Sequence, residues 1–103
     1  MFDNQRYITK RISEEIPLNL VLFMWSRIDV LKATTAGKLD YLHVFELKEI
    51  NEFAVLENQL VIHRSEDPQY IKSYAFTVRK PVTTKIYVID SGPYSTMMFA
   101  EEY

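Results

Sequence analysis

The triplet Asp90-Ser91-Gly92 is the stretch of this chain that looks most like a catalytic motif. It follows an apolar run, residues 86–89, which is the position that a catalytic carboxylate takes in aspartic proteases. Such an enzyme needs two carboxylates that share a proton, together with a substrate cleft and flaps. Only eleven residues follow Gly92, and the whole chain has two glycines. We therefore interpret the triplet as a hairpin turn, in which Gly92 adopts a positive φ and Pro93 fixes the exit.

Two histidines, His43 and His63, are the other side chains that could perform acid–base or metal chemistry. Both fall in strand-like segments, and their spacing is not that of a helical zinc site. The chain has no cysteine, so a metal site would need carboxylates to complete it. A glycine-flanked nucleophilic serine and a glycine-rich phosphate loop are also missing from the sequence. We predict no catalytic, cofactor-binding or metal-binding residues, and we interpret both histidines as partly exposed strand residues.

The composition fits one globular domain that spans residues 1–103. Hydrophobic residues make up 48% of the chain and charged residues 25%. A net charge of −2 and scattered basic residues disfavour a nucleic-acid partner. The longest apolar run, residues 20–25, is too short to span a membrane, and the N-terminal residues do not resemble a signal peptide. Because the absence of cysteine is compatible with a reducing compartment, we expect a cytoplasmic protein with no membrane partner.

One amphipathic helix is predicted from Pro17 to about Thr35. The two acids before Pro17 complement the start of a helix, and proline suits its first position. Apolar residues then recur three and four positions apart, which is the spacing of one helix face, at Val21, Met24, Ile28 and Leu31. Gly37 is expected to stop the helix.

The rest of the chain is rich in strand-forming residues. Strands are predicted over residues 5–12, 40–48, a segment that ends at 64, 70–78, 85–90 and 94–100. Short connections imply antiparallel pairing, whereas the segment 50–57 could begin a strand or form the tip of a hairpin. The predicted fold is α+β, with an antiparallel sheet of five or six strands packed on one helix.

An aromatic stripe on one strand is the candidate interaction surface. Tyr70, Tyr74 and Phe76 lie an even number of residues apart, so they share one face of the strand 70–78. Such a stripe suits a contact surface, or simply a buried sheet face. Trp25 could also stack on a ligand, but its place beside the apolar face of the helix indicates a core residue.

Several predicted strands carry apolar residues on both faces, although a one-sided antiparallel sheet should alternate between apolar and polar. A single helix can cover only one of these faces. The second face must be hidden by a second chain or by a sheet that curls into a partial barrel, because large exposed apolar patches are uncommon on monomers. We favour a homodimer that packs through this face, with the stripe as a contributor, and keep the curled monomer as the alternative.

The chain resembles the family named domain of unknown function 960, which comprises small proteins of Gram-positive bacteria and their phages. The resemblance extends over nearly the whole chain. Its strongest parts are the segments Arg6-Tyr7-x-Thr9, Glu15-Ile16-Pro17 followed by Phe23 and Trp25, Tyr94-Ser95-Thr96-Met97, and Ala100-Glu101-Glu102-Tyr103. It implies a bacterial cytoplasmic protein, but it brings neither a known activity nor functional residues.

Two hypotheses about function remain open from the sequence. The first is a non-catalytic protein-interaction or accessory module, indicated by the missing catalytic set and by excess apolar and aromatic side chains on strands. The alternative is a small-molecule binder or minor enzyme whose polar groups, such as His43 and His63, converge only in three dimensions. A concave pocket beside either histidine would support the second hypothesis. Neither hypothesis identifies a partner, a ligand or a cofactor.

Overall fold

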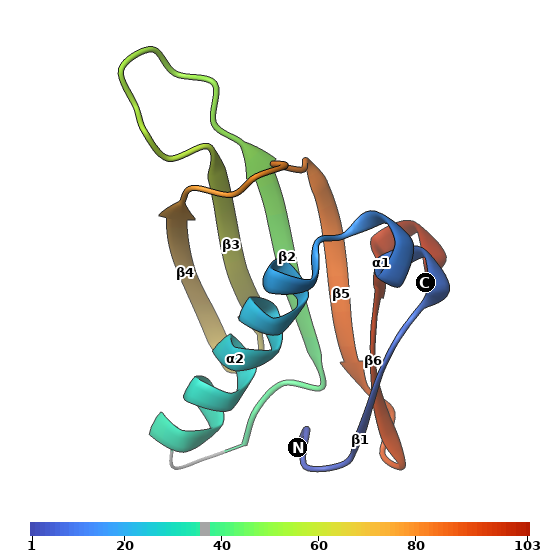
Figure 1. Ribbon diagram of the computed structural model, residues 1–103. Helices are drawn as coiled ribbons and strands as arrows, with labels where there is room; N and C mark the ends of the chain where they lie inside the picture. Colours follow the sequence, from blue (N-terminus) through green and yellow to red (C-terminus); the bar gives the residue numbers. More distant parts are fainter. Residues whose placement is uncertain (36–37) are drawn as a thin grey trace.

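The computed structural model describes residues 1–35 and 38–103, which form an open six-stranded sheet with helices on one face (Figure 1). Along the sheet the strands follow the order β1-β6-β5-β2-β3-β4. The elements are β1 (Gln5–Ile8), α1 (Lys10–Glu15), α2 (Leu18–Thr34), β2 (Leu42–Glu49), β3 (Gln59–Glu66), β4 (Gln69–Phe76), β5 (Thr84–Asp90), β6 (Tyr94–Phe99) and the 3-10 turn η1 (Ala100–Glu102). This confirms the predicted α+β class with one main helix on the sheet.

Helix α2 agrees with its predicted bounds to within one residue. Pro17 caps its first turn, with ψ 141°, rather than occupying the first helical position. The helix ends at Thr34, and the predicted stop at Gly37 lies outside the described residues. The residues that α2 buries against the sheet are Leu20, Val21, Met24, Trp25 and Ile28. Trp25 is 8% exposed and therefore belongs to the core, as expected.

The first predicted strand is too long. It ends at Ile8, and the residues that follow form helix α1. The Thr9 side chain caps this helix by accepting a hydrogen bond from the Ile12 backbone N–H at 3.2 Å. An ion pair between Arg11 and Glu15, one helical turn apart, adds support. The strand propensity of residues 9–12 is outweighed here by a cap and by the burial of Ile12.

Sequence-adjacent strands pair as predicted in three places: β2 with β3, β3 with β4, and β5 with β6 are antiparallel. The connection from β4 to β5 instead crosses the end of the sheet, so that β5 pairs with β2. Strand β1 is parallel to β6, which corrects the prediction of a wholly antiparallel sheet. The sheet is mixed because β1 runs parallel to its neighbour β6, whereas the other pairs are antiparallel.

The sheet is open and does not close into a barrel. Strands β1 and β4 are its two edges, and they lie on opposite sides of the sheet (Figure 1). Both helices contribute to a single core with Phe45, Val61, Ile86 and Met97 from the strands. The helices therefore cover the same face. In the part of the chain that the structure describes, no helix lies over the other face.

Candidate functional site

The Asp90 carboxylate holds a turn and the N-terminal segment together. Its Oδ1 accepts hydrogen bonds from the Gly92 backbone N–H at 2.8 Å and from the Asn4 side chain at 3.1 Å. Its Oδ2 accepts one from the Phe2 backbone N–H at 2.7 Å. Gly92 has φ +100°, and residues 91–93 connect β5 to β6. The interpretation of this triplet as a hairpin turn is confirmed.

Electrostatics agree with this holding role. Burial alone would raise the pKa of Asp90, but hydrogen bonds from Phe2, Gly92 and Asn4 outweigh burial and lower it. A general acid at neutral pH needs the opposite shift. The carboxylate is therefore ionised and already hydrogen-bonded, which suits a structural residue.

The two histidines, predicted as partly exposed, lie fully buried beneath the helices. His43 on β2 and His63 on β3 are both 0% exposed, and the His43 Nδ1 atom lies 2.8 Å from the His63 Nε2 atom. Neutral imidazoles can share such a bond when one nitrogen donates and the other accepts. The remaining two nitrogens, His43 Nε2 and His63 Nδ1, have no hydrogen-bond partner among the described residues.

Aromatic rings surround this histidine pair. Phe2 contacts His43 edge-on at 5.3 Å, Phe45 stacks on His63 at 4.3 Å, and Tyr70 contacts His63 edge-on at 5.1 Å, measured between ring centroids. Burial lowers the pKa of both imidazoles, and for His63 the neighbouring His43 and Arg27 lower it further, to about 3. Both rings are therefore neutral at physiological pH. Neither imidazole ring lines any of five surface pockets, which have volumes of about 170–330 Å³.

No group of three or more acidic or histidine side chains suited to a metal ion occurs within residues 1–35 and 38–103. The hypothesis of a site built around the histidines required a concave pocket beside one of them. Because both rings are enclosed by aromatic side chains, the histidine pair is a feature of the core rather than a surface site.

The stripe Tyr70, Tyr74 and Phe76 lies on the face of β4 that points toward α2. Phe23 of α2 contacts Tyr74 at 5.2 Å and Phe76 at 5.0 Å, both edge-on. The Arg27 guanidinium lies over the Tyr74 ring at 5.3 Å. All three stripe residues are half-buried, so the stripe belongs to the helix side and does not contribute to the opposite face. Binding of a partner at its exposed edge stays a prediction.

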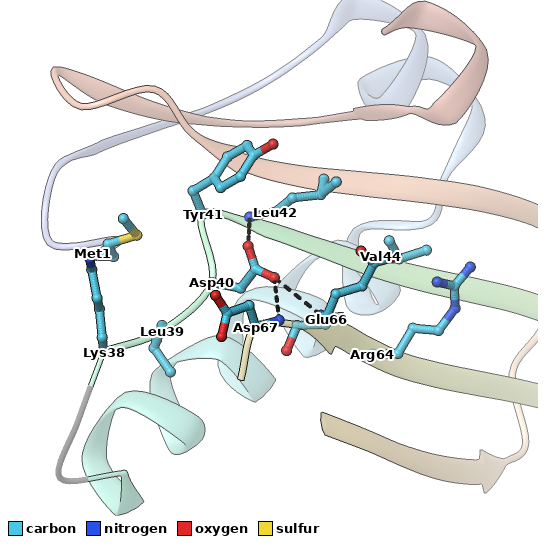
Figure 2. Close-up of a pocket in the computed structure, with 11 residues that line it drawn as sticks. Met1, Lys38, Leu39, Asp40, Tyr41, Leu42, Val44, Arg64, Glu66 and Asp67 are labelled. Atoms are coloured by element: carbon cyan, nitrogen blue, oxygen red, sulfur yellow. Dashed lines mark hydrogen bonds between the residues drawn. The ribbon is translucent and has the colours of Figure 1, made fainter. Parts of the chain in front are cut away.

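A pocket of about 330 Å³ lies where β2 begins and β3 ends (Figure 2). Asp40 lies in its wall, and its carboxylate accepts backbone hydrogen bonds from Leu42 at 3.1 Å, Glu66 at 3.1 Å and Asp67 at 2.9 Å. Burial would raise the pKa of Asp40, but these three hydrogen bonds outweigh burial and lower it. Asp40 thus fastens the start of β2 to the β3–β4 turn. The rest of the pocket wall combines apolar side chains, from Met1, Leu39, Tyr41, Leu42 and Val44, with the polar or charged residues Lys38, Arg64, Ser65, Glu66 and Asp67.

The sheet face opposite the helices is here called the uncovered face. An ion pair crosses its centre, in which the Arg64 guanidinium donates to Glu46 at 2.9 Å. Because strand residues alternate between faces, apolar side chains from five strands share this surface with that pair. They are Leu42, Val44, Leu60, Ile62, Ile71, Tyr87, Ile89, Tyr94 and Met98.

Sequence reasoning found the uncovered face but not the residues that organise its ends. The predicted strands carry apolar residues at both odd and even positions, and this pattern indicated that both faces of the sheet are apolar. Asp40 gave no signal, because its partners at Glu66 and Asp67 are distant in sequence. The histidine pair could not be predicted either, since the contact depends on the register in which Phe45 lies opposite His63.

The fold and these surfaces define a small α+β protein that has one helix-covered sheet face and one uncovered face. Its Asp90 carboxylate has a structural role. The family described as "Staphylococcal protein of unknown function (DUF960)" matches residues 5–102, and the chain belongs to this family. A search of curated proteins found no match. A solved structure of a protein of unknown function from Enterococcus faecalis is similar in fold, with a TM-score of 0.76 and 22% identity. The similarity covers 98% of this chain and 92% of that one.

No helix in the described part of the chain is both long enough and apolar enough to cross a membrane.

Proposed function

We propose that this protein is a non-catalytic interaction module that pairs with a second copy of itself through the uncovered face. The single observation that carries the proposal is the set of apolar side chains that five strands place on a face without a helix. Burial of such surface is the main driving force for protein association.

A second copy suits this face for reasons of symmetry. The Glu46–Arg64 pair lies at its centre, so a two-fold axis through that region would place an acid of each copy near an arginine of the other. The apolar residues that flank the pair would contact apolar residues of the second copy. The same face carries Lys48 and Lys85 near Glu46, so its charges gather around β2 and most of its apolar residues lie on the flanking strands. A surface of this kind can be self-complementary, which favours an isologous dimer.

The alternative, a small-molecule binder or minor enzyme, has less support. The histidines that could perform chemistry are buried away from the pockets, and the carboxylates of Asp40 and Asp90 are occupied by backbone hydrogen bonds. An interaction role uses the features that the surface does present. The cytoplasm is the setting that we propose for it.

Light scattering on a dilution series of the pure protein tests the dimer. We expect a mass twice the 12.2 kDa of one chain at micromolar concentration. The variant Ile62→Lys, at the middle of the uncovered face, should shift the mass toward 12.2 kDa. The matched control is Leu22→Lys, because Leu22 is 59% exposed on the outer side of α2 and should leave the dimer intact.

Circular dichroism should show that both variants are folded. A wild-type mass of one chain at every concentration would overturn the dimer. Equal effects of the two substitutions would show that the uncovered face is not the surface that pairs.

A further inference from the structure

The connection between β2 and β3, residues 50–58, carries the most exposed apolar side chains of the described chain. Phe53 is 100% exposed and Leu56 is 86% exposed. The loop extends well beyond the end of the sheet (Figure 1). Loop tips are normally polar, with residues chosen for turn chemistry. A phenylalanine held entirely in solvent points to a contact that the isolated chain does not make.

The base of this loop is braced, so its direction is set by the fold. Asn58 exchanges two hydrogen bonds of 2.8 Å with the backbone of Val78, one in each direction. The Ile50 N–H donates to the Asn58 carbonyl oxygen at 2.9 Å, and the Thr77 hydroxyl donates to the Leu56 carbonyl oxygen at 3.2 Å. A braced loop loses little conformational entropy when its tip binds.

Backbone strain at the tip supports a functional reading. Ala54, directly after Phe53, has φ +68°, which is the left-handed region that non-glycine residues rarely adopt. Strain of this kind persists where the surrounding structure fixes it, and it concentrates at binding sites.

The pocket of Figure 2 lies at the opposite end of the same two strands. It is formed where β2 begins and β3 ends, whereas the loop joins the end of β2 to the start of β3. A volume of about 330 Å³ is sufficient for an aromatic ring with an aliphatic neighbour. Tyr41 and Leu42 supply apolar wall, and Tyr41 is 50% exposed.

A two-fold axis that lies between two uncovered faces and runs across their strands would bring these two features together. If two sheets pack face to face with their β2 strands antiparallel, each loop lies at the pocket end of the other copy. Resting on the dimer proposed above, we infer that Phe53 and Leu56 of each copy occupy the pocket of the other copy.

The area of the uncovered face agrees with this exchange. Six strands of four to eight residues, about 4.8 Å apart and rising about 3.3 Å per residue, outline roughly 600–700 Å². Stable interfaces bury about 800 Å² per partner. The sheet face alone falls short of this value, and two exchanged loops make up the difference.

Charges leave the contact mainly apolar. The loop carries Glu52 and Glu57, and the pocket wall carries Lys38 and Arg64. Asp40, Glu66 and Asp67 also line the pocket, so the wall carries three acids against two bases. Lys38 is exposed at the pocket and is the basic residue that can approach an incoming glutamate. Steering by charge is therefore weak, and salt should change the dimer affinity little.

Cysteine cross-linking tests the inference directly, because the native chain has no cysteine. The double variant Phe53→Cys with Tyr41→Cys should give a covalent dimer with a short bismaleimide. Strand β2 alone separates the two positions within one chain by about 25 Å, so the link must form between chains. The matched controls are Phe53→Cys alone and Phe53→Cys with Leu22→Cys, which should give far less covalent dimer.

A second variant separates the inference from the proposed function. Phe53→Ser should weaken the dimer at least tenfold while the fold is retained, because the side chain is fully exposed. A wild-type dimer that Phe53→Ser leaves unchanged, with no cross-link between positions 53 and 41, would overturn the loop exchange and leave the sheet-face dimer standing. Efficient cross-linking of Phe53→Cys alone would place loop against loop and also overturn the exchange. A monomeric wild-type protein would overturn both.

Discussion

The Nδ1 atom of His43 and the Nε2 atom of His63 lie 2.8 Å apart in the core, where both side chains are fully buried. One hydrogen bond thus serves two buried titratable groups, and one nitrogen on each ring has no partner in the described structure. A buried polar pair of this kind is tolerated only while both rings stay neutral.

Stability should therefore fall as the pH is lowered below the ordinary histidine pKa. Folding lowers the pKa of both rings, that of His63 from 6.5 to about 3, so the unfolded chain binds more protons than the folded chain in this window. The stabilisation is complete above pH 6.5 and is lost as the pH falls, by up to about 1.4 kcal/mol per pH unit for each histidine. Urea unfolding at a series of pH values measures the slope.

The same prediction can be checked without perturbing the core. In the folded protein the His63 ring should remain neutral at pH 5, and the His43 ring should titrate below its ordinary pKa of 6.5, which histidine NMR spectra report directly. The acids whose pKa folding lowers, such as Asp40 and Asp90, lose their contribution only at lower pH. A free energy of unfolding that is constant from pH 7 to 5 would contradict the neutral pair, as would a ring that titrates near 6.5.

Replacing Asp90 with alanine should release the N-terminal segment. The substitution leaves the Phe2 N–H and the Gly92 N–H without their acceptor, at a cost of about 1–3 kcal/mol in the free energy of unfolding. Glu14→Ala is the matched control, since Glu14 is exposed on α1. Urea unfolding measures both, and faster hydrogen exchange in β1 for the Asp90 variant alone would show that the loss is local. Equal stabilities of the two variants would contradict the holding role.

Gly92→Ala isolates the backbone requirement of the β5–β6 turn. A Cβ at this position meets nothing within 4 Å, so crowding is not the problem. The φ of +100° is the problem, and forcing alanine into it should cost about 1–2 kcal/mol. Thermal unfolding measures the loss. The neighbouring Ser91→Ala, at an exposed position, should leave the melting temperature nearly unchanged.

Phe23 and Tyr74 should show coupled contributions to stability. Their rings meet edge-on at 5.2 Å between α2 and β4. Phe23→Ala should destabilise the protein by about 2 kcal/mol, since the ring is only half-buried. A double-mutant cycle with Tyr74→Ala should give a coupling energy of about 0.5–1.5 kcal/mol. Additive losses would show that the helix contact does not anchor the stripe.

Local patterns predicted much of this fold. The apolar spacing of α2 and the strand alternation after residue 40 lie in consecutive residues, where periodicity can be read. The turns at Asp67-Pro68 and at residues 91–93 carry their own turn chemistry. Helix α1 departs from the predicted strand over residues 5–12 because the Thr9 cap and the burial of Ile12 outweigh local strand propensity.

Strand order could not be predicted from the same patterns. The pairing of β5 with β2 depends on which edge remains free after β3 and β4 have paired, which is a property of the whole sheet. The parallel contact of β1 with β6 has no local signature for the same reason. The histidine contact depends on the register between β2 and β3. The exposure of Phe53 depends on residues 50–57 forming a loop, which local patterns left open.

The neighbourhood of β1 and β6 also sets the order in which the chain can fold during synthesis. Of the six strands, β1 is made first and its pairing partner β6 is made last, and Asp90, which holds Phe2, comes just before β6. Until then, β1 has no partner strand, and Phe2 has no fixed place beside His43. The hairpins from β2 to β4 can form earlier from nearby residues, whereas completion of the sheet waits for β6. A nascent chain that stops before residue 90 would lack β6, so β1 would have no partner strand and the core would lack Met97 and Phe99.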